Sequence, residues 1–179
     1  MPDMIRDGVG KGYLAQVDVE NRLDVYSTME SEISHESEVN NRAFTWTHQY
    51  DSDDGDTIML LKNTSSTLNL IIQAMVVGVT DTTNFTLHNP SNTTLAGSTI
   101  TGTNLNLGSA LSADASCYGD ETGNTTGTVL MYGRFTADMA ATVEFEGSII
   151  LGTSNELALN IASGSNTSVT FIGYYHEVE

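Results

Sequence analysis

A run of carboxylates is the densest group of side chains in this sequence that could do chemistry. Asp51, Asp53, Asp54 and Asp56 fall within six residues. Carboxylate oxygens are ligands that Ca²⁺ prefers, so the run is a candidate calcium site. Its spacing departs from that of an EF-hand loop, because Gly55 stands where the third ligand would be. The simpler interpretation is a solvated turn, in which Asp and Gly serve the turn geometry.

The other candidates for catalysis are histidines and a single cysteine. The histidines are His35, His48, His88 and His176. No two of them stand at metal-ligand spacing, and the chain has no Gly-x-Ser-x-Gly motif. Cys117 has Asp114, Asp120 and Glu121 as its charged neighbours, whereas a reactive thiolate needs an electropositive setting. We therefore expect an inert thiol, no catalytic residue, no enzyme activity, and no cofactor apart from calcium at the carboxylate run.

Length and charge narrow the range of functions. The chain has 179 residues, which suits one domain with a short arm. It carries 6 Lys+Arg against 23 Asp+Glu, a net charge of −17. Such a chain will not attract phosphates or anionic lipid surfaces, so we expect no nucleic-acid and no membrane partner. The most apolar stretch, residues 70–79, is too short to span a bilayer, and the N-terminus lacks the apolar region of a secretory signal.

The acidity comes from a scarcity of bases more than from an abundance of acids. Lys11 and Lys62 are the lysines of the chain, and polar uncharged residues take up much of the composition. One interpretation is a halophilic protein, because salt screens the self-repulsion of an acidic surface that stays soluble. The other interpretation is an ordinary acidic surface protein.

The pattern of the first 43 residues predicts an arm followed by a short connection. Three glycines at every second position, Gly8, Gly10 and Gly12, argue against a helix. Residues 13–18 and 22–26 alternate in hydrophobicity around a turn at 19–21, which predicts a β-hairpin. Residues 27–42 have a capping-box pattern, Ser27 before Glu30, and a narrow apolar face. We interpret them as a short helix or, alternatively, an extended acidic linker.

Strand patterns dominate from Phe44 onward. Period-two alternation or short apolar runs between turn residues predict strands, which we place at 44–50, 57–63, 67–79, 84–88, 127–135, 142–151, 156–162 and 168–175, with one or two more within 94–107. Residues 108–126 are predicted to be a polar loop. Many short strands without regular helices indicate an all-β, antiparallel β-sandwich, and the strand count fits a jelly roll best. The domain organisation is then 1–28 (arm and hairpin), 29–43 (linker or helix) and 44–179 (sandwich).

The N-terminal segment also carries a resemblance to a known group of proteins. Residues 7–23 read DGVGKGYLAQVDVENRL. The pattern DG-x-G-x-GY-x-A-x-V-x-x-x-NRL is similar to a segment that recurs in virion proteins of tailed bacteriophages and archaeal tailed viruses. The rest of the chain is similar in layout, with a Phe-Thr-Trp strand at 44–46, a Gly-Asp-Thr turn at 55–57, a Gly-Asp-Glu-Thr-Gly loop at 119–123 and a closing Ile-Gly-Tyr-Tyr at 172–175.

The resemblance implies a structural role at the capsid surface of a virion. Proteins of this kind are capsid decoration (cement) proteins, turret or head-fibre subunits, or short adhesins, and many are trimers of jelly rolls. The implied partners are further copies of the chain in a homotrimer and the major capsid protein or another virion protein. We expect the arm to make these contacts by adding strands to a neighbour, through Gly8, Gly10, Gly12, Tyr13, Leu14, Val17, Arg22 and Leu23.

Two other functions stay open. The first is a receptor- or glycan-binding jelly-roll adhesin on the head or tail of the virion, with a host surface glycan as its partner. Its candidate sugar platforms are Trp46, Tyr118, Tyr132, Tyr174 and Tyr175, although core and turn positions are the simpler interpretation for most of them. The second is a carbohydrate-active jelly-roll enzyme, for which the sequence indicates no acid–base pair.

Overall fold

A computed structural model describes residues 4–6, 14–17, 23–24, 31–51, 57–91, 93, 95–121, 124–162 and 166–177. The chain divides into two compact units, residues 1–31 and 32–179. The first unit holds a three-stranded antiparallel sheet of β1 (Met4–Arg6), β2 (Leu14–Val17) and β3 (Leu23–Asp24). β2 and β3 pair where the sequence predicts a hairpin, and β1 adds a strand that the sequence did not predict.

The predicted arm contacts fall only partly within the described residues. Leu14 and Val17 lie in β2, and Leu23 lies in β3. The other members of the set, Gly8, Gly10, Gly12, Tyr13 and Arg22, lie outside the described residues. Their proposed contacts therefore stay predictions.

The second unit begins with a short helix, so the helical alternative is correct for residues 32–40. α1 (Glu32–His35) continues into one π-helical turn, η1 (Glu36–Asn40). The helix ends at Asn41, whose left-handed backbone (φ 57°) lets the chain turn toward the sheets. The Tyr174 hydroxyl donates a hydrogen bond to Glu32 Oε2 at 3.0 Å, so the helix is held against the last strand. Ser27 and Glu30 of the predicted capping box lie outside the described residues.

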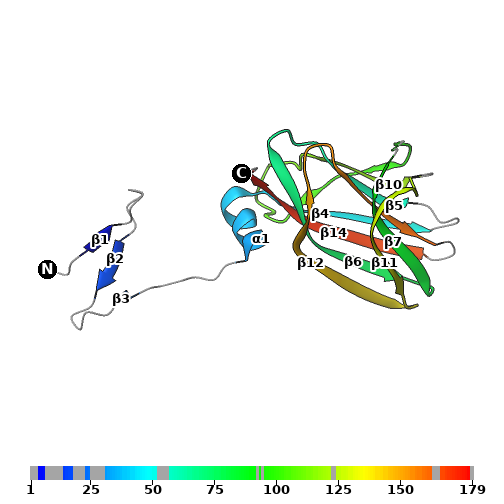
Figure 1. Ribbon diagram of the computed structural model, residues 1–179, viewed down its shortest axis with the longest axis horizontal. Coiled ribbons are helices and arrows are strands. Elements are labelled where there is room, and N and C mark those ends of the chain that lie inside the picture. Colours follow the sequence, from blue (N-terminus) through cyan, green and yellow to red (C-terminus); the bar gives the residue numbers. More distant parts are fainter. Residues whose placement is uncertain are drawn as a thin grey trace. The chain divides into compact units, whose positions relative to one another are not determined.

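Two antiparallel sheets form the body of this unit, which is an all-β sandwich (Figure 1). The five-stranded sheet has the order β12-β6-β14-β4-β9, and the six-stranded sheet has the order β11-β7-β13-β5-β10-β8. Their bounds are β4 (Ala43–Asp51), β5 (Thr57–Asn63), β6 (Leu68–Val79), β7 (Thr83–Pro90), β8 (Ser98–Ile100), β9 (Thr103–Asn104), β10 (Ala115–Glu121), β11 (Gly127–Phe135), β12 (Met139–Leu151), β13 (Glu156–Ile161) and β14 (Asn166–Glu177).

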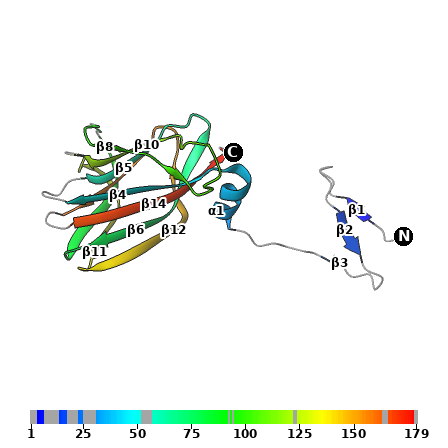
Figure 2. The same ribbon diagram turned by 180° about the vertical axis from the view of Figure 1, so that it is seen from behind.

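The chain passes between the two sheets in a regular way. β4, β6, β12 and β14 belong to one sheet, and β5, β7, β11 and β13 belong to the other. The first and last of these strands, β4 and β14, pair over nine residue positions from Asn166↔Asp51 to Tyr174↔Ala43. β5 and β13 pair in the same way in the opposite sheet. Early and late strands therefore lie side by side in both layers, as Figure 2 shows for β4 and β14.

The core fills the space between the sheets and follows the period-two pattern of the sequence. Trp46, Phe171 and Met75 are fully buried members of the five-stranded sheet, and Met59 and Leu159 face them from the six-stranded sheet. Along β6 the buried and half-buried positions alternate over most of the strand, as the pleat requires. This apolar interior accounts for the stability of a sandwich that contains no disulfide.

The predicted polar loop at 108–126 is wrong in its second half, because residues 115–121 form β10. This strand pairs with β5 on one side and β8 on the other, with Cys117 opposite both Leu61 and Ile100. The Gly-Asp-Glu part of the expected loop at 119–123 likewise belongs to the strand. Turn-forming residues dominate the local composition and hide the strand. Gly119 is needed for packing rather than for a turn, because a Cβ there would lie 2.5 Å from the His48 ring.

The two sides of the sandwich end in strands of very different length. On one side the edge strands are β8 and β9, which have 3 and 2 residues. On the other side the edge strands are β11 and β12, which have 9 and 13 residues and follow one another in the chain. β12 is interrupted by a bulge between Glu144 and Ile149, where Gly147 has φ 75°.

Candidate functional site

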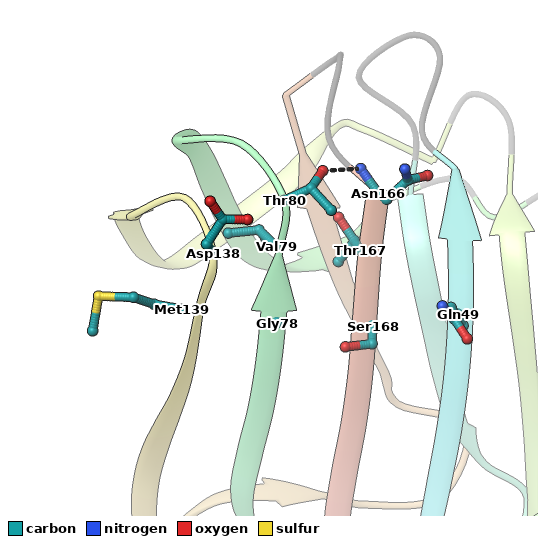
Figure 3. Close-up of a pocket in the computed structure, with 9 residues that line it drawn as sticks. All are labelled: Gln49, Gly78, Val79, Thr80, Asp138, Met139, Asn166, Thr167 and Ser168. Atoms are coloured by element: carbon teal, nitrogen blue, oxygen red, sulfur yellow. Dashed lines mark hydrogen bonds between the residues drawn. The ribbon is translucent and has the colours of Figure 1, made fainter.

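A shallow pocket lies on the outer face of the five-stranded sheet, at the end where β6 finishes and β12 and β14 begin (Figure 3). Its volume is about 250 Å³. Gly78, Ser168 and Gln49 are neighbours in one cross-strand row. The missing side chain of Gly78 creates the hollow, because a Cβ there would lie 2.8 Å from Ser168 Oγ. At the rim, the Asn166 amide donates a hydrogen bond to Thr80 Oγ1 at 3.0 Å.

The chemistry of this pocket is that of a weak polar binding surface. It offers the hydroxyls of Ser168 and Thr80, the Gln49 amide and the Asp138 carboxylate. None of its lining residues is a histidine, lysine, arginine or cysteine, and the Asp138 carboxylate is the ionisable side chain among them. The pocket can hold a small polar molecule.

The candidate calcium residues lie next to this pocket along the backbone. Asp51 ends β4 and stands opposite Asn166, which lines the pocket. Asp53, Asp54 and Asp56 lie outside the described residues. The structure therefore leaves both interpretations of the run open. Within the described part of the chain, no group of three or more His, Cys, Asp or Glu side chains is placed to hold a metal ion.

The histidines and the cysteine lie apart from one another. His48 is half-buried on β4, and burial lowers its pKa, while Asp120 acts in the opposite direction. Cys117 is fully buried in the core, and burial raises the pKa of its thiol. His35 belongs to α1, whereas His176 lies near the end of β14. The burial of Cys117 supports the prediction of an inert thiol, since a reactive thiolate needs exposure and a lowered pKa.

His88 belongs to a buried polar cluster that the sequence did not indicate. His88 Nε2 donates to the Asn124 carbonyl at 2.9 Å, and Thr57 Oγ1 donates to the same oxygen at 3.0 Å. The Glu121 carboxylate accepts through Oε2 from the Ala96 amide at 2.8 Å. His88 Nδ1 and Glu121 Oε1 have no hydrogen-bond partner among the described residues. These bonds fasten the segment around Asn124 to the six-stranded sheet. No pattern of neighbours in the sequence could have indicated them, because the five residues come from separate strands and connections.

A second polar pocket, of about 420 Å³, surrounds an ion pair on the six-stranded sheet. Lys62 Nζ lies 2.7 Å from Glu156 Oε1, and the Thr93 hydroxyl donates to the other oxygen of the same carboxylate. The pocket is completed by Asn89, Pro90, Ser91, Ser154 and Asn155. Its hydroxyl, amide and charged groups suit a hydroxylated ligand better than an apolar one.

Next to this pocket lies a groove of about 200 Å³ with a mixed lining. Leu130 of β11 and Ile149, Ile150 and Leu151 of β12 are its apolar residues, and Asn89, Ser148, Asn155 and Glu156 are its polar residues. Large apolar side chains continue along both edge strands, where Val129, Leu130, Tyr132, Met139 and Ile150 are each 51% to 69% exposed. These five residues are called the open edge below.

Most of the aromatic residues proposed as sugar platforms are not accessible. Trp46, Tyr174 and Tyr175 are buried, with at most 2% of their surface exposed. Tyr118 is half-buried, and Tyr132 is exposed on the open edge. The core interpretation is therefore correct for Trp46, Tyr174 and Tyr175.

Comparisons of the chain with protein-family models, with curated proteins and with solved structures found no match. Within the described residues, no helix is long and apolar enough to cross a bilayer. The residues and geometry above are therefore the basis for any functional proposal.

Proposed function

We propose that the chain is a non-enzymatic structural protein of a virion, a trimeric decoration or turret subunit attached to the major capsid lattice at the capsid surface. The observation that carries the proposal is a β-sandwich whose long edge strands, β11 and β12, expose several large apolar side chains. Among the described residues, the groups able to do chemistry are buried, paired or dispersed. Such a molecule is suited to assembly with other proteins.

We infer that the sandwich is a jelly roll. The two layers β12-β6-β14-β4 and β11-β7-β13-β5 support this inference, because eight strands cross between two sheets with the first strand paired to the last. β8, β9 and β10 are then additions at the side opposite β11 and β12. A jelly roll has short connections and needs no cofactor, which suits a particle component.

The N-terminal unit supplies the attachment in this proposal. Residues 1–31 form a compact unit with a three-stranded sheet of their own. β1 and β3 are the edge strands of that sheet, so their outer main-chain groups can pair with a strand of another protein. The sequence resemblance of residues 7–23 supports a virion protein as that partner.

The test is association with virus particles. Particles from cells that produce the chain are banded on a density gradient and probed with an antibody against residues 32–179. We expect the chain to band with the particles, and we expect recombinant protein lacking residues 1–31 to fail to rebind particles stripped of the native chain. The full-length protein is the positive control for rebinding. Absence of the chain from every particle band would reject the virion role.

A second candidate function is that of a receptor- or glycan-binding adhesin. The polar pocket around Lys62 and Glu156 favours it, because hydroxyl, amide and charged groups converge there in a volume that suits a small ligand. The burial of three of the five proposed aromatic platforms weakens it. A glycan array probed with the full chain distinguishes this candidate, which requires specific binding that Glu156→Gln abolishes.

A further inference from the structure

The polar pocket around Lys62 and the mixed groove beside it adjoin along a common wall. They share three lining residues, Asn89, Asn155 and Glu156. The two parts are together called the joined groove below. Its polar part alone, at about 420 Å³, lies within the roughly 300–1,000 Å³ that is typical of small-molecule sites. The joined groove therefore has the size of a site for a small ligand.

Main-chain hydrogen bonds fix the walls of the polar part. Lys62 and Glu156 stand directly opposite each other on the paired strands β5 and β13. The turn before β13 is tied to the end of β5 by two bonds. The Asn63 amide donates to the Asn155 carbonyl at 3.0 Å, and the Ser154 amide donates to the Asn63 carbonyl at 2.9 Å. A ligand thus meets a preformed site, and its binding costs little ordering of the backbone.

The side chains of the polar part present donors and acceptors side by side. Lys62 Nζ carries three N–H groups, of which one goes to Glu156 Oε1 at 2.7 Å, and the Lys62 side chain is 32% exposed. Asn89 and Asn155 are exposed, and each amide group both donates and accepts hydrogen bonds. A sugar hydroxyl also both donates and accepts, so a ring with neighbouring hydroxyls matches this lining.

The charges of the joined groove favour an uncharged ligand. An anionic ligand would meet the Glu156 carboxylate beside Lys62, together with the field of a chain of net charge −17. A cationic ligand would meet the Lys62 ammonium group. Glu156 is only 8% exposed, and its two oxygens already accept from Lys62 and Thr93. We therefore regard Glu156 as a positioning residue that holds Lys62 in place.

The mixed part of the joined groove adds apolar surface next to these polar groups. Leu130, Ile149 and Ile150 line it beside the shared residues Asn89 and Asn155. Leu130 and Ile150 are 51% and 55% exposed, so an apolar group of a ligand can reach them. Removing such a group from water favours binding. A ligand with a small apolar group next to its hydroxyls can thus use both parts.

We propose that the joined groove binds a neutral saccharide with a small apolar substituent, such as the methyl of an acetamido group or of a 6-deoxy sugar. Ring hydroxyls form hydrogen bonds with Lys62, Asn89 and Asn155, and the substituent lies against Leu130. The inference goes beyond the virion role. It deepens the second candidate function, a glycan-binding adhesin, on which it rests for its biological setting, by naming the class of ligand and its orientation.

The test probes an array of neutral and acidic glycans with the full chain. The array contains N-acetylglucosamine beside glucose and L-fucose beside L-galactose, pairs that differ only in the substituent. We expect neutral glycans to be bound, with a preference of about 10-fold for the substituted member of a pair, since one apolar group in a fitting site has roughly this effect. Titration of the best-bound glycan then gives the affinity of each variant.

Four variants locate the ligand. Asn89→Ala and Asn155→Ala should each weaken binding by about 10-fold, the effect of losing one or two hydrogen bonds. Leu130→Ser should remove the preference for the substituent while binding of the unsubstituted sugar persists. Asn84→Ala is the matched control, because Asn84 is an exposed asparagine of the same strand, β7, outside the joined groove. It should leave the affinity unchanged, and circular dichroism verifies that each variant is folded.

The possible failures are distinguishable. Glycan binding that is unchanged in Asn89→Ala and Asn155→Ala would overturn the site and leave the adhesin candidate standing. Binding limited to acidic glycans, or equal for both members of each pair, would overturn the proposed ligand class in the same way. A full chain that binds no glycan on the array would overturn the inference and the adhesin candidate together. Particle banding judges the virion role separately in every case.

Discussion

The side chain of Asn63 should be one of the largest single polar contributions to the stability of the sandwich. Asn63 ends β5 and is fully buried, and its side chain makes three hydrogen bonds. Its Nδ2 donates to the carbonyls of Leu151 and Leu68 at 2.8 and 2.9 Å, and its Oδ1 accepts from the Ser65 amide at 3.0 Å. The residue thereby ties the connection between β5 and β6 to the end of β12.

Asn63→Ala removes all three hydrogen bonds, so the Leu151 and Leu68 carbonyls and the Ser65 amide lose their side-chain partner. Two of the bonds are buried, and each abandoned buried group costs about 1–3 kcal/mol, whereas the half-buried third bond costs about 0.5–1 kcal/mol. We expect a loss of about 4 kcal/mol, a large part of the 5–15 kcal/mol that is typical of a domain. For a chain of this length, that corresponds to a fall in Tm of roughly 10 °C.

The assay is thermal and urea unfolding of the full chain, followed by circular dichroism. Asn84→Ala is the matched control, because Asn84 is exposed on β7, and its replacement should change stability by no more than about 0.5 kcal/mol. Asn63→Asp tests the same reasoning with almost no change of volume, since it turns the two donated bonds into repulsions between oxygens. If Asn63→Ala unfolds within a degree or two of the control, the three bonds do not hold the connection and the reasoning is refuted.

Three further measurements follow from the described geometry. Burial and the hydrogen bond to Glu32 raise the pKa of Tyr174 to about 12. The contribution of Tyr174 to the free energy of unfolding is therefore complete below about pH 10 and is lost as pH rises toward 12. Tyr174→Phe should remove that part of the pH dependence of stability, and an unchanged pH profile would contradict this prediction. The Cys117 thiol, buried and with a raised pKa, should react with Ellman's reagent only after unfolding in denaturant, whereas fast labelling of the native chain would show that the core is open at β10. Ca²⁺ or a chelator should leave Tm unchanged if residues 51–56 are a simple turn, and a saturable rise in Tm that Asp53→Asn and Asp54→Asn abolish would establish the calcium site instead.

The sequence predicted the strands well where turn residues bracket an alternating or apolar run. β5 and β11 have the predicted bounds, because the turn-forming residues Asn63 and Gly127 stand where β5 ends and where β11 begins. β10 was missed for the opposite reason, since Ser, Asp and Gly fill a strand whose packing depends on one cysteine and on the absence of a side chain at Gly119. Amino-acid composition indicates where turn-forming residues gather, but it does not indicate that a neighbouring side chain, here His48, needs the space beside Gly119.

The candidate surfaces were harder to predict than the strands. Alternation shows which residues of a strand face a core, but it does not show which strand lies at an edge. The run at Val129–Tyr132 therefore carried no signal of exposure until the pairing of β11 with β7 alone was known. Likewise, the sequence gives no sign that His88 is buried, because its burial depends on the contact with the distant Asn124 carbonyl.

The unequal sides of the sandwich limit how large an assembly its strands could build. A sheet that can be extended at both edges can add copies without end, which is how fibres grow. In residues 32–179 the short strands β8 and β9 close one side, so strand addition is open only along β11 and β12. Strand addition to residues 32–179 is therefore restricted to one side of the sandwich, which separates this fold from sheets that can extend at both edges.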